Sequence, residues 1–147
     1  LNGREVSPNG RGYNLVSLDP AGNLLAAASF DTHADPVASA HLAKWVAAQP
    51  PGTVVAGASR DEASMNLEAP ALDALRLLGV TTDLRGHFRW GHAFISVASL
   101  PGETASVSWA LPQEDADAVR PVQASLGLPL SEPQVAAQFY EVQVIDK

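Results

Sequence analysis

The sequence contains no cysteine and only two lysines, Lys44 and Lys147, and both scarcities restrict its chemistry. Without cysteine the chain forms no disulfide, no thiolate nucleophile and no cysteine-ligated zinc site. With 9 basic and 16 acidic residues, its net charge of −7 is opposite to the dense basic surface that nucleic acid requires. We therefore expect no nucleic-acid partner and no polybasic membrane patch.

Long apolar runs are also absent, since no stretch of about 18 apolar residues occurs and membrane insertion is not expected. The 147 residues, 46% hydrophobic and 17% charged, suffice for one globular domain over 1–147. Residues 1–10, with two Asn, two Gly and a Pro, indicate a linker arm. The first residue is Leu1 rather than Met, and we expect covalently linked domains of a larger parent protein.

Local patterns predict strands that outnumber helices. A turn at 19–23 joins strands at 13–18 and 24–30, and Thr32 or Asp35 could cap the first helix. Gly79 is a plausible residue just beyond the end of the second helix. The helices are predicted at 36–48 and 70–78, further strands at 53–58, 93–98, 106–111 and 138–146, and a short helix plus loop at 113–128. This order indicates an α+β fold with mainly antiparallel strands.

Three polar clusters adjoin the apolar strands: residues 11–14, 60–64 and 89–92. Arg supplies a planar fork of donors, Asp supplies acceptors and Trp supplies an apolar face, which together suit the hydroxyls and C–H face of a sugar ring. The same residue types also form ordinary surface ion pairs, and Trp is most often a core residue. The clusters therefore suggest a sugar site without establishing one.

Motifs for other chemistries are missing. No HExxH, G-x-S-x-G, GKS/T or GxGxxG pattern occurs, so neither a metal nor a cofactor is expected. The alternation of Asp31, His33 and Asp35 is better explained by helix capping than by a cation site. Adjacent carboxylates at 61 and 62 are a poor match to the separated pair of a glycosidase. A triad of serine, histidine and aspartate at 64, 92 and 61 has little support, because such combinations arise by chance.

Five segments resemble the interleukin-like EMT inducer family, which includes the FAM3 cytokine-like proteins and the stem domain of protein O-mannose N-acetylglucosaminyltransferase. They are R-G-Y-N-L-V-S-L at 11–18, F-D-T at 30–32, D-E-A-S-M-N-L at 61–67, L-R-L-L-G at 75–79 and R-W-G-H-A-F-I at 89–95. Their order and spacing match over about 10–97. The resemblance implies two curved antiparallel β-sheets, sandwich-like, flanked by two or three short helices.

The resemblance also implies a site. The stem domain binds a terminal β-linked N-acetylglucosamine through side chains whose counterparts here are Arg11, Asp61 and Arg89. We expect Trp90 or His92 to form the apolar wall of that site, since His92 stands where the family often has an aromatic residue. Ser64, the last residue of the D-E-x-S motif that begins at Asp61, completes the predicted sugar-binding set, given in full as Arg11, Asp61, Ser64, Arg89, Trp90 and His92.

These observations predict a non-catalytic, lectin-like module that recognises a terminal sugar, an N-acetylhexosamine, with an extracellular or cell-surface location. Two alternatives stay open. One is a secreted cytokine-like protein-binding domain, which the missing cysteines disfavour because the FAM3 proteins carry disulfides. The other is a glycan- or ester-hydrolysing enzyme that uses residues 61, 62, 64 or 92.

Overall fold

The computed structural model describes residues 1–98, 107–110, 123–127 and 134–138, and its chain begins with a β-hairpin. The turn between β1 (Gly12–Leu18) and β2 (Leu24–Phe30) is held by Asp19, whose carboxylate accepts hydrogen bonds from the backbone N–H groups of Ala21 and Asn23, both at 2.9 Å. Gly22 adopts φ +88°, which a residue with a Cβ rarely adopts. The predicted hairpin is confirmed.

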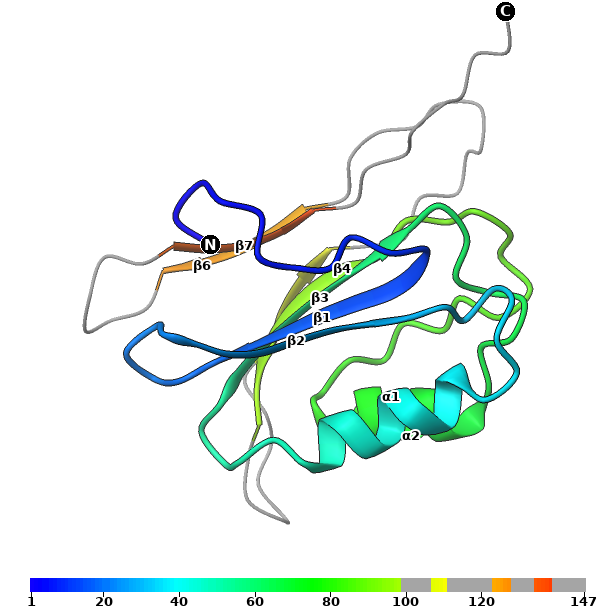
Figure 1. Cartoon of the computed structure of the whole chain (residues 1–147), viewed down its shortest axis with the longest axis horizontal. Coiled ribbons are helices and arrows are strands. Elements are labelled where there is room, and N and C mark those ends of the chain that lie inside the picture. The colour runs from blue at the N-terminus through cyan, green and yellow to red at the C-terminus, as the bar shows by residue number, and fades with distance from the viewer. Residues whose placement is uncertain (99–106, 111–122, 128–133, 139–147) are drawn as a thin grey trace, which may run out of the picture.

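The sheet continues with strands from later in the chain, in the order β2-β1-β3-β4-β5, every neighbouring pair antiparallel. The remaining strands of this sheet are β3 (Val54–Arg60), β4 (Ala93–Val97) and β5 (Val107–Ala110). The helices α1 (Ala38–Ala47) and α2 (Ala69–Leu77) lie together on one face of the sheet (Figure 1). The α+β class predicted from the sequence is confirmed.

A second, smaller sheet is formed by the antiparallel pair β6 (Gln123–Gly127) and β7 (Gln134–Gln138). This pair contacts β3, β4 and β5 on the face of the main sheet opposite the helices (Figure 1). The sandwich-like arrangement is therefore seen in part, as a five-stranded layer against a two-stranded one. The described residues contain two helices, within the two or three that were predicted.

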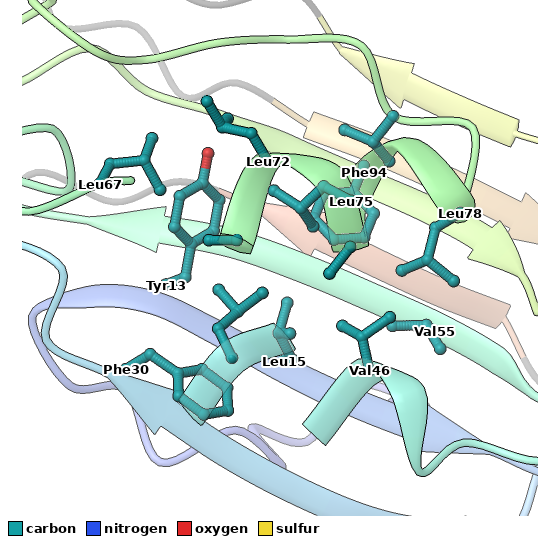
Figure 2. Close-up of a cluster of buried hydrophobic side chains, with 14 of the residues drawn as sticks. Tyr13, Leu15, Phe30, Val46, Val55, Leu67, Leu72, Leu75, Leu78 and Phe94 are labelled. Atoms are coloured by element: carbon teal, nitrogen blue, oxygen red, sulfur yellow. The ribbon is translucent and has the colours of Figure 1, made fainter. Parts of the chain in front are cut away.

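The main core fills the space between the helices and the sheet. Alternate strand residues point into it, among them Tyr13 and Leu15 of β1 and Phe94 of β4, all with no exposed surface. Figure 2 shows them facing the apolar stripe of α2, including Leu72 and Leu75. The strand residues between them, such as Val16 and Ile95, point to the opposite face of the sheet and form a second core there.

The N-terminal arm packs against that second core through Leu1 and Val6. Residues 1–10 contain no helix or strand, as expected of an arm, but their apolar side chains cover part of the sheet. The arm is therefore attached to the domain along its length and does not simply lead into it.

The helix ends differ in how well they were predicted. The first helix begins at Ala38 rather than at 36, with Val37 at its N-cap and no side chain capping it. Thr32 instead donates to the Ala63 carbonyl at 2.9 Å, whereas the Asp35 carboxylate accepts from the Val37 N–H at 3.0 Å, the bond expected of a capping residue followed by Pro36. After α2, Gly79 adopts φ +78° and donates to the Arg76 carbonyl at 2.8 Å. This is the predicted glycine-terminated helix end.

Three predictions beyond residue 98 have different outcomes. The strand expected at 106–111 is confirmed by β5. The short helix plus loop predicted at 113–128 is wrong at Gln123–Gly127, which is strand β6, because a polar, proline-bounded sequence gave no period to distinguish an edge pair from a helix. The strand predicted at 138–146 lies outside the described residues except for Gln138.

Candidate functional site

The polar loops that the sequence singled out meet at one end of the main sheet. In the antiparallel register Gly12 pairs with Arg60, Tyr13 pairs with Phe30, and Ala58 pairs with Ala93. The start of β1, the ends of β2 and β3, and the loop before β4 therefore share this end. We call Arg11, Asp31, Asp61 and Arg89, one from each of these places, the sheet-end cluster.

The four side chains of this cluster form two ion pairs. Arg11 donates from Nε and Nη2 to the two carboxylate oxygens of Asp31, at 3.1 and 2.7 Å. Arg89 Nη2 donates to Asp61 Oδ1 at 3.2 Å. The hydrogen bonds that Arg11 donates to Asp31 are the main cause of its raised pKa, and the negative charge of Asp61 raises it further.

The cluster is open to solvent. Its side chains are between 37% and 48% exposed, so solvent screens both pairs and they contribute little to stability. The three residues predicted to bind sugar, Arg11, Asp61 and Arg89, lie at the same end of the sheet and are divided between these two ion pairs. The fold gains little stability from these exposed pairs.

The loop that carries Arg11 is fixed by its neighbours. Gly12 adopts φ +91°, and a Cβ there would stand 2.1 Å from the Phe30 carbonyl oxygen, so only glycine lets β1 approach β2 so closely. The Asn14 side-chain amide, which is buried, donates to the Gly10 carbonyl and accepts from the Gly10 N–H, both at 2.7 Å. The R-G-x-N motif thus contains one projecting side chain and two residues that shape its loop.

We expect Asn14→Ala to lower the free energy of unfolding by about 1–3 kcal/mol, because it leaves both polar groups of Gly10 without their partner in a partly buried place. Urea unfolding measures the loss. Asn23→Ala, which removes an exposed amide from the hairpin turn, is the control and is expected to cost less. Equal costs for the two variants would mean that the Gly10–Asn14 bonds add nothing particular.

The loop that carries Asp61 is built around the buried carboxylate of Glu62. One of its oxygens accepts from the Ser64 N–H at 2.7 Å and from the Ser64 hydroxyl, and the other pairs with His33 Nδ1 at 2.7 Å. Burial raises the pKa of Glu62, but the hydrogen bonds from Ser64, His33 and Met65 outweigh it, and the net pKa lies below the usual value. Glu62 therefore stays ionised and holds the turn closed.

Ser64 is consequently an anchoring residue. Its side chain is buried and its hydroxyl donates to Glu62, so it does not face the solvent where a sugar would bind. Thr32 and Asn66 add to the same scaffold: the Asn66 N–H donates to the Thr32 carbonyl at 2.7 Å, and the Asn66 amide donates to the His33 carbonyl. The sequence motifs marked these residues but did not separate anchoring from binding.

Two members of the sheet-end cluster have unusual backbones. Asp61 adopts φ +59° and Arg89 adopts φ +62°. The left-handed region costs a residue with a Cβ about 1 kcal/mol or more, and aspartate tolerates it better than arginine does. Such strained positions tend to gather at functional sites. Here they occur at both partners of one ion pair.

The predicted apolar wall is placed differently from the expectation. His92 has no exposed surface, and its Nδ1 lies 2.9 Å from the Tyr13 hydroxyl, so it is beneath the cluster and cannot line an open site. Burial lowers the pKa of His92 to about 4. Trp90 is half-buried, packs against the core and stacks on His87 with ring centroids 3.8 Å apart. The exposed aromatic residue of this loop is Phe88, which sequence reasoning did not select.

The triad, metal-site and membrane-span alternatives can be compared with the described residues. Ser64 bonds to Glu62 and His92 to Tyr13, so residues 61, 64 and 92 do not form a hydrogen-bonded triad. Within the described ranges, no group of three or more His, Asp or Glu side chains is arranged to hold a metal ion. None of the helices seen there has the length and apolarity needed to cross a bilayer.

Comparison of the chain with protein-family models finds one match. The model of the interleukin-like EMT inducer family matches residues 11–99, which is more than half of the chain. The matched stretch contains β1 to β4, both helices and the whole sheet-end cluster. A search of curated proteins found no match.

Proposed function

The chain belongs to the interleukin-like EMT inducer family, and from that premise we propose that it is a non-catalytic carbohydrate-binding module whose site is the sheet-end cluster. One observation carries the proposal. Arg11, Asp61 and Arg89, separated by up to 78 positions in the sequence, are brought to one solvent-exposed end of the sheet where stability does not require them.

The chemistry of the cluster suits a sugar. Two guanidinium groups present N–H donors in planar forks, and two carboxylates present acceptors, so the cluster can bond to both sides of a hydroxyl. An acetamide needs the same combination, a donor for its carbonyl and an acceptor for its N–H. The exposed ring of Phe88, next to Arg89 in the chain, supplies an apolar surface in the same loop.

The ligand we propose is a terminal N-acetylhexosamine, by resemblance to the stem domain that uses the same three residue types. Binding at a single such site is expected to be weak, because hydroxyl bonds to the protein replace bonds to water. Linked domains in a larger parent protein, at an extracellular or cell-surface location, would add the avidity that such modules need.

We expect Asp61→Ala to weaken binding of the methyl β-glycoside of N-acetylglucosamine by about tenfold or more, because it removes an acceptor and the partner that orients Arg89. Chemical-shift titration measures the dissociation constant. Asp73→Ala is the matched control, since it removes an exposed aspartate paired with Arg76 at 2.7 Å on α2. Asp73→Ala should unfold close to the original chain, and Asp61→Ala should be folded but slightly less stable, because alanine tolerates the φ of +59° at this position less well than aspartate does.

Two results would contradict the proposal. One is the absence of shifts at the sheet-end cluster for every N-acetylhexosamine tested. The other is an Asp61→Ala variant that binds as well as the Asp73→Ala control. Retained folding without any sugar binding would favour a protein-binding domain, whereas turnover of a glycoside or ester would favour an enzyme.

A further inference from the structure

The sheet-end cluster has a fourth member that the family resemblance did not assign to sugar binding, and its position affects which sugars the site accepts. We propose that Asp31 makes the site selective for neutral sugars by occupying and neutralising Arg11. This inference rests on the proposed function, because it concerns the ligand of the same site. It identifies Asp31 as a residue that determines specificity through Arg11.

The charge balance of the cluster supports this role. Each guanidinium is engaged by its own carboxylate, Arg11 by Asp31 and Arg89 by Asp61, so two positive charges meet two negative ones. The ionised carboxylate of Glu62 lies in the same loop as Asp61. Arg60, at the same end of the sheet, donates to the Asn9 carbonyl at 2.6 Å, so three guanidinium groups face the three carboxylates of Asp31, Asp61 and Glu62. An acidic sugar that approaches this surface therefore meets no net positive charge, and the net charge of −7 on the whole chain opposes it further.

The geometry of the Arg11–Asp31 pair shows which donors of Arg11 the Asp31 carboxylate occupies. The two-pronged contact engages Nε and Nη2, which are the donors that a carboxylate or sulfate of a ligand would otherwise bind. For an anionic group to use them, it would have to displace Asp31. A neutral hydroxyl can instead bond to the Asp31 carboxylate and to the remaining donors of Arg11 without separating the pair.

The turn that follows Asp31 needs a side-chain oxygen at this position but does not need a negative charge. Its Oδ1 accepts from the His33 and Ala34 N–H groups at 3.3 and 3.1 Å, which an asparagine oxygen would also do. Its Oδ2 accepts from Arg11 Nη2 at 2.7 Å. In an Asp31→Asn variant an amide N–H₂ would oppose that donor, so the turn would persist while Arg11 would lose its counter-charge.

The experiment compares three ligands on three proteins. The ligands are the methyl β-glycoside of N-acetylglucosamine and its 6-sulfate, with the 6-O-methyl ether as a neutral control for size. The proteins are the original chain, Asp31→Asn and Asp73→Asn, and the last two share the same change in net charge. Dissociation constants are measured by titration at low and at high salt.

We expect the original chain and Asp73→Asn to bind the sulfated sugar at least about fivefold more weakly than the 6-O-methyl ether. Asp31→Asn should reverse this order, and its gain for the sulfated sugar should fade as salt screens the unpaired Arg11. A purely structural role for Asp31 would lower the affinities for all three ligands together and leave their ratios unchanged.

The outcomes separate the two proposals. Equal or tighter binding of the sulfated sugar by the original chain would overturn the role of Asp31 while leaving the carbohydrate-binding function intact. An unchanged preference in Asp31→Asn would also overturn it. If no sugar binds to any of the three proteins, the proposed function fails, and this inference fails with it.

Discussion

Phe94→Ala is expected to lower the free energy of unfolding by about 3–5 kcal/mol, the typical cost of truncating a fully buried phenylalanine. The Phe94 side chain has no exposed surface and belongs to the core beneath both helices (Figure 2). Its loss would leave a cavity between β4 and the helices that rigid neighbours cannot fill. Urea unfolding monitored by circular dichroism gives the magnitude.

Phe88→Ala is the matched control, because it makes the same chemical change at a ring that is 58% exposed. Its effect should stay within about 0.5 kcal/mol. A similar loss for the two variants would mean that the packing of Phe94 is not what makes it costly.

The position of Phe94 opposite Gly57 also allows the register of the sheet to be tested. Gly57 lies opposite Phe94 in the β3–β4 pair, and a Cβ at Gly57 would stand 2.4 Å from the Phe94 ring. Gly57→Ala should therefore destabilise the domain by about 1–3 kcal/mol through overpacking. The added Cβ would also stand 2.5 Å from Leu15 Cδ2, so combination with Phe94→Ala should relieve only part of the cost, and fully additive losses would contradict the contact with Phe94.

The order of elements up to residue 98 was predictable because the signals were local. The turn at Asp19–Asn23, the buried run that became β3 and the glycine after α2 each fix one element without reference to the rest. The start of α1 was not predictable in this way. Thr32 looks like a capping residue, but its hydroxyl is committed to the carbonyl of Ala63 in a loop 31 positions away.

The candidate site was predictable in its charged residues and not in their surroundings. Arg11, Asp61 and Arg89 were found because motif spacing marks them, and the antiparallel register brings them to one end of the sheet. The sequence could not show that the Ser64 hydroxyl donates to Glu62. Neighbouring polar residues in a loop have the same sequence signal, and only the backbone conformation determines which of them are buried. The pairing of Arg11 with Asp31 joins residues 20 positions apart and was missed for the same reason.

His92 illustrates how burial reverses an interpretation based on residue type. A histidine among arginine and tryptophan suggests a surface site, yet its ring lies against Tyr13 and Phe94, with centroids 5.8 and 5.5 Å away. Its Nε2 is buried and has no hydrogen-bond partner among the described residues. Such a group is held in its neutral form by the cost of burying a charge.

This burial gives the protein a predictable acid sensitivity. Burial lowers the pKa of His92 to about 4 from the ordinary value of 6.5. As the pH falls below 6.5, the unfolded chain takes up a proton at this position and the folded chain does not. The stability that the neutral, buried His92 contributes to the folded chain is therefore fully present above pH 6.5 and is lost progressively as the pH falls to about 4. The loss amounts to about 2 kcal/mol at pH 5 and about 3 kcal/mol at pH 4.

The pH range separates this effect from that of the carboxylates. Hydrogen bonding lowers the pKa of Asp31, and the bonds to Glu62 outweigh its burial, so both groups also lose stabilising interactions in acid. Their unfolded pKa values lie near 4, however, so their contribution falls mainly below about pH 5. Between pH 5 and 6.5 the slope of stability against pH therefore reports chiefly on His92.

The measurement is the free energy of unfolding from urea titrations at several pH values between 5 and 7. We expect His92→Gln to be less stable than the original chain at pH 7 but to lose much less between pH 6.5 and 5, because glutamine takes up no proton. His41→Gln, at an exposed position on α1, should keep the original slope. A His92→Gln variant with that same slope would show that His92 is not held neutral by the fold, and a slope abolished by His41→Gln would assign the acid sensitivity to the surface.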